Sequence, residues 1–241
     1  MPEALLSLAG VNTHIGQYHI LQGVDFEVPR AGLTVLLGRN GAGKTTTLRT
    51  IMGLWKASAG AIHYEGAEIT RRATPELAQL GIAYVPENMG IFAGLTVREN
   101  LLLAARSGPP DEKRLDWIFR LFPAMQKFWN GLAGNLSGGQ KQMLAIARAI
   151  VEPRKLLLVD EPTKGLAPSI ISNMIEAFKE LKRTETSLLV VEQNFHFARA
   201  LGDTVAVMDS GRIVHAGRMA DLAADAQLQT KLLGLSLESH Q

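Results

Sequence analysis

The sequence predicts an α/β fold in which a parallel sheet presents a phosphate-binding loop. Two observations lead to this prediction. The apolar run Leu33–Leu37 leads directly into Gly38–Thr45, which fits the pattern G-x-x-x-x-G-K-[ST] of such loops. Leu156–Val159 and Leu188–Val191 are also short and wholly apolar, as is typical of strands that are buried on both faces of a parallel sheet.

The beginning of the chain has the pattern of antiparallel β structure. Leu5–Val11 and Leu21–Val28 are expected strands, and a turn at residues 29–32 separates the second of them from the loop strand. Ala61–Ile69 has the pattern of a hairpin that turns at Glu65-Gly66. We therefore expect an N-terminal antiparallel β portion beside the parallel sheet.

The middle of the chain is predicted to be helical. Val97–Ala105, Asp111–Phe122 and Gly138–Val151 carry apolar residues at spacings of three and four. Apolar strands resume after Pro153. We expect a single domain, with a core formed by residues 1–87 and 154–241 and a helical subdomain inserted at residues 88–153.

The composition of the chain excludes several classes of function and of functional site. A chain of 241 residues with 46% hydrophobic content is long enough for one large domain with a substantial core. The net charge is only +2 and the basic residues are scattered, which argues against a nucleic-acid partner. With 0 cysteines, disulfides, thiolate nucleophiles and Cys-ligated zinc are excluded. We see no signal peptide and no apolar run as long as a membrane helix needs.

The phosphate-binding loop predicts ATP and Mg²⁺ as cofactors. Glycines let the loop bend tightly, so that backbone N–H groups point at phosphate oxygens. Lys44 is expected to reach the β- and γ-phosphates, and the Thr45 hydroxyl to bind Mg²⁺. The helix expected over Thr45–Met52 points its N-terminus at the phosphates. The expected nucleotide contacts are Gly38, Asn40, Gly41, Ala42, Gly43, Lys44, Thr45 and Thr46.

A second segment, Leu136-Ser137-Gly138-Gly139-Gln140, makes the function more specific. Together with the loop, this LSGGQ segment resembles the signature of the ATP-binding cassette (ABC) family. The resemblance implies a RecA-like P-loop NTPase core and transport driven by ATP hydrolysis. Asp160-Glu161 resembles the second nucleotide motif of that family, which implies that Asp160 holds Mg²⁺ and Glu161 activates the hydrolytic water. The alternative is that this pair only caps the next helix.

The signature segment itself is expected to open a helix. A second phosphate site is then formed by the Ser137 hydroxyl, by Gln140 and by the backbone N–H groups of Ser137, Gly138 and Gly139. One chain already has a complete phosphate loop, so this site is redundant within a monomer. The resemblance implies that it covers ATP held by a second subunit in a head-to-tail dimer. The alternative is an ordinary Ser-capped helix.

Three departures from the commonest cassette pattern indicate a subgroup. Glu87 replaces the usual Gln, Gln193 replaces the usual His, and residues 164–168 replace an Asp-containing loop. This combination resembles the second of the two ATPases in importers of branched-chain amino acids and related polar solutes. Gln193 still donates a hydrogen bond to a γ-phosphate and Glu87 still binds Mg²⁺ or water, so we expect hydrolysis to be retained.

The sequence offers more than one candidate for the residue that stacks on adenine. Ile15 occupies the position where the family usually has an aromatic side chain, and Tyr18 or His14 is the substitute. The alternative is that the base rests on Ile15 and Tyr18 is an ordinary strand residue.

The resemblance also implies partners. We expect the permease subunits of an ABC transporter, a second ATPase subunit (a different chain in the cell, or a second copy in isolation), and indirectly a periplasmic or extracellular solute-binding protein. The expected location is the cytoplasmic face of the inner membrane. Met89, Ile91 and Phe92 either border the groove that receives a permease helix or fill the helical subdomain's core.

Three other functions remain as alternatives. The first is the ATPase of a lipid or lipopolysaccharide exporter, against which residues 164–168 and 191–194 argue. The second is a soluble cassette protein without a permease, which would need long coiled coils or two cassettes that this chain lacks. The third is a phosphate-loop kinase, against which the signature argues.

Overall fold

The computed structural model describes residues 4–106 and 108–234, and it contains two sheets within these ranges. The first is antiparallel, with strand order β2-β1-β4-β5. Its strands are β1 (Ala4–Ile15), β2 (Tyr18–Pro29), β4 (Ala57–Tyr64) and β5 (Ala67–Glu68). β4 and β5 pair through Tyr64 and Ala67, so the chain turns at Glu65-Gly66 as the sequence predicts.

The second sheet carries the phosphate-binding loop and has the strand order β10-β9-β3-β8-β7-β6. Its strands are β3 (Gly32–Leu37), β6 (Ile82–Val85), β7 (Leu156–Asp160), β8 (Ser187–Glu192), β9 (Thr204–Asp209) and β10 (Arg212–Arg218). All neighbours are parallel except β9 and β10, which form an antiparallel pair at one edge. The loops that follow β3, β6, β7 and β8 therefore meet at the carboxyl edge of the sheet.

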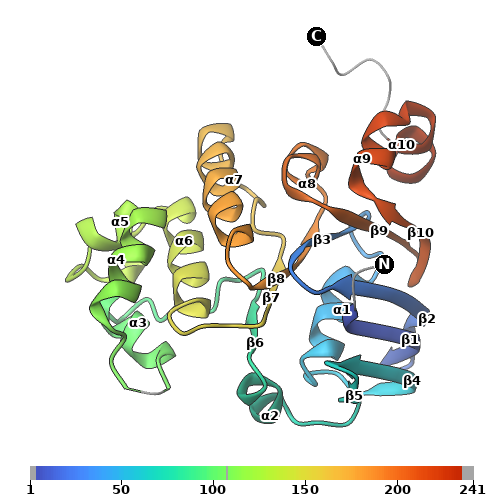
Figure 1. Cartoon of the computed structure of the whole chain (residues 1–241), viewed down its shortest axis with the longest axis horizontal. Helices are drawn as coiled ribbons and strands as arrows, with labels where there is room; N and C mark the ends of the chain where they lie inside the picture. The colour runs from blue at the N-terminus through green and yellow to red at the C-terminus, as the bar shows by residue number, and fades with distance from the viewer. Residues whose placement is uncertain (1–3, 107, 235–241) are drawn as a thin grey trace.

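Helices fall into two groups. Those of the core are α1 (Lys44–Ile51), α2 (Thr74–Gln79), α7 (Pro168–Lys182), α8 (Phe195–Leu201), α9 (Met219–Ala224) and α10 (Ala226–Leu233). Those of the middle region are α3 (Val97–Ala104), α4 (Glu112–Leu121), α5 (Pro123–Lys127), a 3₁₀ turn (Ala133–Asn135) and α6 (Gly138–Ala149). Figure 1 shows α3–α6 on one side of the molecule and the antiparallel sheet on the other, with the parallel sheet between them.

Two apolar cores fix this arrangement, because β3 alternates its side chains between them. Val35 and Leu37 face the core that includes the middle helices, whereas Leu36 faces the core shared with the antiparallel sheet and α1. No helix within the described ranges is long and apolar enough to cross a membrane.

Candidate nucleotide-binding and hydrolysis site

The phosphate-binding loop lies between β3 and α1, as the sequence predicts. Gly43 is the N-cap of α1 with φ 109°, a left-handed conformation that favours glycine. A Cβ on Gly38 would lie 2.3 Å from the Met208 carbonyl oxygen of β9. The strand beside β3 thus excludes any side chain at Gly38, which explains why this loop position is a glycine.

Lys44 crosses the inside of this loop. Its side chain is only 4% exposed, and its Nζ lies 3.1 Å from the Arg39 carbonyl oxygen and 3.2 Å from Glu161 Oε1. A buried ammonium needs both a counter-charge and hydrogen bonds, and the loop and Glu161 supply them. The cation and the carboxylate that the sequence assigns to phosphate and water therefore already meet in one pocket.

Thr45, in the first turn of α1, and Asp160, at the end of β7, are brought together. The Thr45 hydroxyl donates to Asp160 Oδ1 at 3.0 Å, and the Tyr84 hydroxyl donates to Oδ2 at 3.2 Å. Burial raises the pKa of the Asp160 carboxyl, and these two hydrogen bonds offset only part of that effect. Burial likewise raises the pKa of Tyr84 to about 12.

One hydroxyl and one carboxylate fit Mg²⁺, which keeps several waters and takes further oxygens from a bound phosphate. The described residues contain no cluster of three or more carboxylate or imidazole groups that could hold a metal ion by themselves. Any metal at this site therefore needs nucleotide or water to complete its coordination.

Glu161 follows β7 directly and has an unusual backbone. Its φ is 46°, a strained value for a residue with a side chain, and its N–H donates to the Val191 carbonyl of β8 at 2.9 Å. Burial raises the pKa of the Glu161 carboxyl, but the hydrogen bond from Gln193 and the charge of Lys44 outweigh burial and hold this pKa below its usual range. Because α7 begins only at Pro168, the alternative that Asp160-Glu161 caps the next helix is wrong.

Gln193 links this carboxylate to the phosphate loop. Its Nε2 donates to Glu161 Oε1 at 2.8 Å and to Asn40 Oδ1 at 2.6 Å. The amide thus spans the mouth of the site, where it can donate to a phosphate oxygen in place of Asn40.

Sequence reasoning missed Glu192, the buried last residue of β8. Its Oε1 accepts from both the N–H and the hydroxyl of Thr163, at 3.0 and 2.7 Å. Its Oε2 accepts from the backbone N–H groups of Gln193 and Asn194, at 3.0 and 3.1 Å. Burial raises the pKa of this carboxyl. Glu192 therefore ties the loop of Gln193 to the loop that follows Glu161, and the signal in the sequence is a carboxylate that ends a wholly apolar strand.

Glu87 and Lys164 complete one side of the pocket. Lys164 Nζ lies 2.6 Å from Glu87 Oε1 and 3.4 Å from Glu161 Oε2. The pocket has a volume of about 300 Å³. It is lined by Ile20, Asn40, Gly41, Gly43, Lys44, Thr45, Thr46, Glu87, Glu161 and Lys164.

The signature residues lie elsewhere, at the start of α6. Ser137 Oγ accepts from the Gln140 N–H at 3.3 Å, and Gln140 Oε1 accepts from the Ser137 N–H at 2.9 Å, which is a reciprocal capping box. Gly139 is buried, and a Cβ there would lie 2.7 Å from Ile170 Cγ2 on α7. A Cβ on Gly138 would meet no atom of the described residues within 4 Å. Packing within the chain explains Gly139 but gives no reason for a glycine at Gly138.

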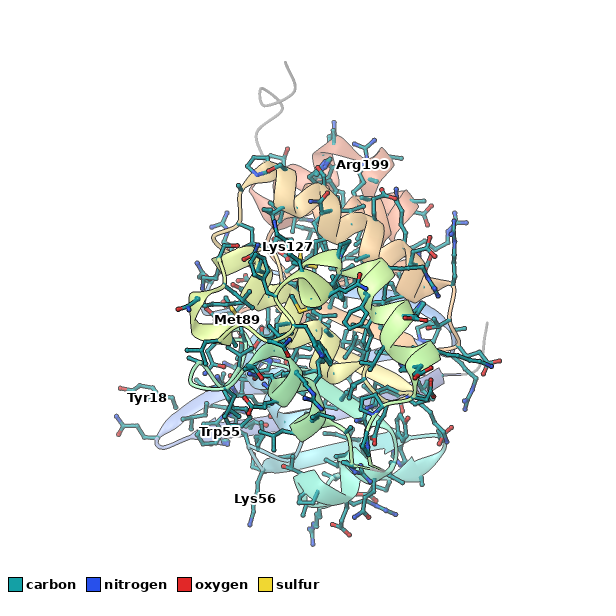
Figure 2. All side chains as sticks on the ribbon, turned by 90° about the vertical axis from the view of Figure 1, so that its left-hand side faces the viewer. Tyr18, Trp55, Lys56, Met89, Lys127 and Arg199 are labelled. Atoms are coloured by element: carbon teal, nitrogen blue, oxygen red, sulfur yellow. The ribbon has the colours of Figure 1, made fainter. Side chains whose placement is uncertain are left out.

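The region expected to hold adenine is open to solvent. Tyr18 is 65% exposed, and Figure 2 shows it projecting from the hairpin of β1 and β2. The ring of His14 stacks on His19, with centroids 4.2 Å apart, and Ile15 is half-buried beside them. Ile20, which the sequence did not single out, lines the phosphate pocket.

A separate groove lies between the core and the middle helices, with a volume of about 600 Å³. Met89 lines this groove and has a left-handed backbone with φ 64°. Phe92 is 49% exposed, and the Arg148 guanidinium lies 4.9 Å from the centroid of its ring. Ile91 packs against the core. The groove is lined by Arg49, Leu54, Trp55, Tyr84, Pro86, Asn88, Met89, Gly90, Ala104, Ala145, Arg148 and Ala149.

Comparison with known proteins identifies the same family over most of the chain. The sequence model of the family described as ABC transporter matches residues 21–164. The chain is 38% identical over 232 residues to the high-affinity branched-chain amino acid transport ATP-binding protein BraG of Pseudomonas aeruginosa, covering 95% of this chain and 100% of that protein. It is 34% identical over 234 residues to the probable branched-chain amino acid transport ATP-binding protein LivF of Archaeoglobus fulgidus, covering 96% and 99%.

A solved ATP-binding cassette of an ABC transporter has the same fold. The TM-score is 0.82 at 26% identity, over 97% of this chain and 100% of that chain. The ADP conformation of that cassette matches with a TM-score of 0.80. With the loop, the second nucleotide motif and the signature all in place, the chain belongs to the ABC transporter family and is one of its ATPases.

Proposed function

We propose that this chain is the ATP-hydrolysing subunit of an importer for branched-chain amino acids or a related polar solute. The observation that carries the proposal is that Lys44 and Gln193 both contact Glu161 Oε1, beside the hydrogen-bonded pair of Thr45 and Asp160. The class of solute rests on the two relatives named for branched-chain amino acid transport. Solute itself does not need to touch this chain.

The residues of the pocket have separate roles in this proposal. The phosphates of ATP are bound by Lys44, Thr46 and the loop backbone from Gly38 to Gly43. Mg²⁺ is held by Thr45 and Asp160, with Glu87 beside them. Mg²⁺ neutralises charge on the phosphates when bound. Glu161 is ionised and accepts the proton of the attacking water, while Gln193 moves its amide from Asn40 to a phosphate oxygen. Ile15 and Tyr18 border the adenine.

Dimerisation follows from the signature. Ser137 and Gly138 are exposed at the N-terminus of α6, outside the phosphate pocket of their own chain. Backbone donors at a helix N-terminus favour an anion, and Gly138 leaves room for close approach. We propose that Ser137, Gly138, Gly139 and Gln140 cover ATP held by a second ATPase subunit, so that two chains enclose two ATP molecules.

Coupling to transport uses the middle helices. In this proposal residues 88–153 move as a subdomain relative to the core of residues 1–87 and 154–241. The groove between them, with Met89 and Phe92 at its border, receives a segment of the permease. The chain then lies at the cytoplasmic face of the membrane, held there by the permease, and contacts the solute-binding protein only through it.

The test is ATP-dependent dimerisation of the Glu161→Gln variant, measured by light scattering with and without Mg-ATP. Removing the carboxylate stops hydrolysis and leaves the ATP-bound dimer intact. We expect a dimer only when ATP is present, either alone or with a candidate partner ATPase that carries His at the position of Gln193. The wild-type protein, which turns ATP over, serves as the control.

A chain that binds ATP but stays monomeric in every mixture, including one that contains the permease, would contradict the composite site. Absence of Mg²⁺-dependent turnover in the complete complex would contradict the roles given to Glu161 and Gln193.

A further inference from the structure

The phosphate pocket contains an excess of carboxylates for a site that receives a polyanion. Glu87 and Glu161 line it, and Asp160 lies directly behind Thr45. ATP brings further negative charge to the same place. Lys44 and Lys164 are the two lysines among the lining residues, and Lys44 is already paired with Glu161.

Lys164 lies where it can offset this charge. Its backbone N–H donates to the Glu161 carbonyl at 3.2 Å, so a tight turn fixes it directly after the strained Glu161. Its ammonium lies 2.6 Å from Glu87 Oε1 and 3.4 Å from Glu161 Oε2. One cation therefore bridges the loop after β6 and the loop after β7.

The two oxygens of Glu161 are held by different partners. Oε1 is paired with Lys44 and accepts from Gln193, whereas Oε2 faces Lys164. Lys164 thus acts on the orientation of Glu161 as well as on the charge of Glu87.

We propose that Lys164 is a positioning residue of the ATPase site, which neutralises Glu87 and ties it to the loop of Glu161 so that the pocket accepts the phosphates of ATP. This inference rests on the proposed roles of Glu87 and Glu161. Because Lys164 is 52% exposed, its pair with Glu87 contributes little to folding, and its effect is on the charge that the nucleotide meets.

The test is a double-mutant cycle on ATP affinity, with Lys164→Gln, Glu87→Gln and the double variant. Affinity is measured by fluorescence of methylanthraniloyl-ATP on the full chain, both with EDTA and with Mg²⁺, so that the readout does not depend on hydrolysis. Melting temperatures of the apo variants verify folding. Lys155→Gln is the matched control, because Lys155 is an equally exposed lysine whose Nζ pairs with Glu65 at 2.8 Å outside this pocket.

We expect Lys164→Gln to weaken nucleotide binding about two- to fivefold in the presence of Glu87, the scale of an exposed charge pair. The same substitution should have no effect when residue 87 is Gln. Lys164→Arg should retain affinity, because a guanidinium can form the same bridge. Lys155→Gln should leave affinity unchanged, which excludes a general effect of net charge.

Two results would overturn the inference. Equal loss with Glu87 and with Gln at position 87 would show that Lys164 contacts the nucleotide directly and does not act through Glu87. No loss in either background would show that the bridge is only a surface ion pair. Failure of the unmodified chain to bind ATP would instead contradict the proposed function, so the two failures are distinguishable.

Discussion

The phosphate loop and the signature bind the same kind of group in this proposal, yet the chain treats them very differently. Lys44 is buried and already has a counter-charge in Glu161, and Thr45 already contacts Asp160. Ser137 and Gly138 are exposed, and the Ser137 hydroxyl accepts from the Gln140 N–H in the first turn of its own helix. We call Lys44, Thr45, Asp160 and Glu161 the assembled half of the site, because they already contact one another in pairs within the chain. Ser137 and Gly138 form the prepared half, which is an exposed surface. Under the proposed function, this difference predicts that a complete hydrolysis site needs a second chain.

The largest effect is expected when the assembled half is broken. Lys44→Met removes the buried ammonium while keeping a side chain of similar length. We expect ATP affinity to fall about 10- to 100-fold, because charge-assisted hydrogen bonds to phosphate contribute about 1.5–3 kcal/mol. Titration calorimetry with Mg-ATP measures this directly. An affinity within twofold of the wild type would place the phosphates away from Lys44.

The prepared half is broken by a different substitution. Ser137→Asp keeps a side chain that caps a helix, so α6 stays folded, but it adds a negative charge at the exposed surface. We expect the ATP affinity of the monomer to be unchanged and the ATP-dependent dimer of the Glu161→Gln background to weaken about tenfold or more, because like charges facing each other cost several kcal/mol.

Ser137→Asn is the matched control, since it caps the helix without the charge. Analytical ultracentrifugation of both variants with Mg-ATP makes the comparison. Equal dimerisation by Asp and Asn variants would show that no phosphate approaches Ser137, and the helix would then be an ordinary Ser-capped one.

The two halves also differ in how far the sequence predicts them. Lys44, Thr45 and Asp160 are predictable because each follows a recognisable apolar strand or lies within a fixed spacing of glycines. Glu192 and Ile20 were missed because their roles depend on contacts between segments far apart in the chain, Thr163 in one case and the phosphate loop in the other. The same holds for Lys164, whose partner Glu87 lies in the loop after β6, far away in the sequence.

Apolar strands and the longer helices were predicted well, whereas the shortest helices were not. The helices α3 and α6 and the strands β3, β7 and β8 agree with the sequence pattern to within a few residues. The short helices α2 and α8, with 6 and 7 residues, were not predicted, because they are too brief to show an apolar period. The exposure of Gly138 was also beyond the sequence, since only the neighbourhood of α6 shows that nothing within the described chain requires a glycine there.

The dependence of stability on pH sharpens the picture of the assembled half. Burial raises the folded pKa of Asp160 above its unfolded value, so its contribution to stability is present below the unfolded pKa of about 3.9 and is lost as pH rises through the folded pKa. Asp160→Asn removes the buried charge and keeps an oxygen for the Thr45 hydroxyl. We expect the apo melting temperature at neutral pH to rise by about 2–4 °C, which corresponds to about 1 kcal/mol, and the difference to vanish in acid.

Glu161→Gln provides a control of opposite sign. Burial raises the pKa of the Glu161 carboxyl, but the contacts with Gln193 and Lys44 outweigh burial and lower this pKa below its usual value. The contribution of Glu161 to stability is therefore present above the unfolded pKa, and it is lost as pH falls through the folded pKa. That variant should melt below the wild type at neutral pH, and this difference should also vanish in acid. Scanning fluorimetry in EDTA from neutral to acid pH measures both. Shifts of the same sign would contradict the opposite directions in which the pKa values of Asp160 and Glu161 are displaced.

The smallest effect is expected for the energetic coupling between Asp160 and Tyr84, where the phosphate site meets the groove. The Tyr84 hydroxyl donates to Asp160 Oδ2, and the Tyr84 side chain also lines the groove proposed for the permease. Tyr84→Phe removes one hydrogen bond and leaves the ring, so we expect a loss of about 1 kcal/mol of stability at neutral pH. In an Asp160→Asn background the same substitution should cost less, because the partner no longer carries a buried charge that needs a donor. Equal costs in the two backgrounds, measured by urea unfolding, would mean that the groove and the Asp160 carboxylate are independent. Unequal costs would identify Tyr84 as a direct physical connection between the surface proposed to contact the permease and the site proposed to hold Mg²⁺.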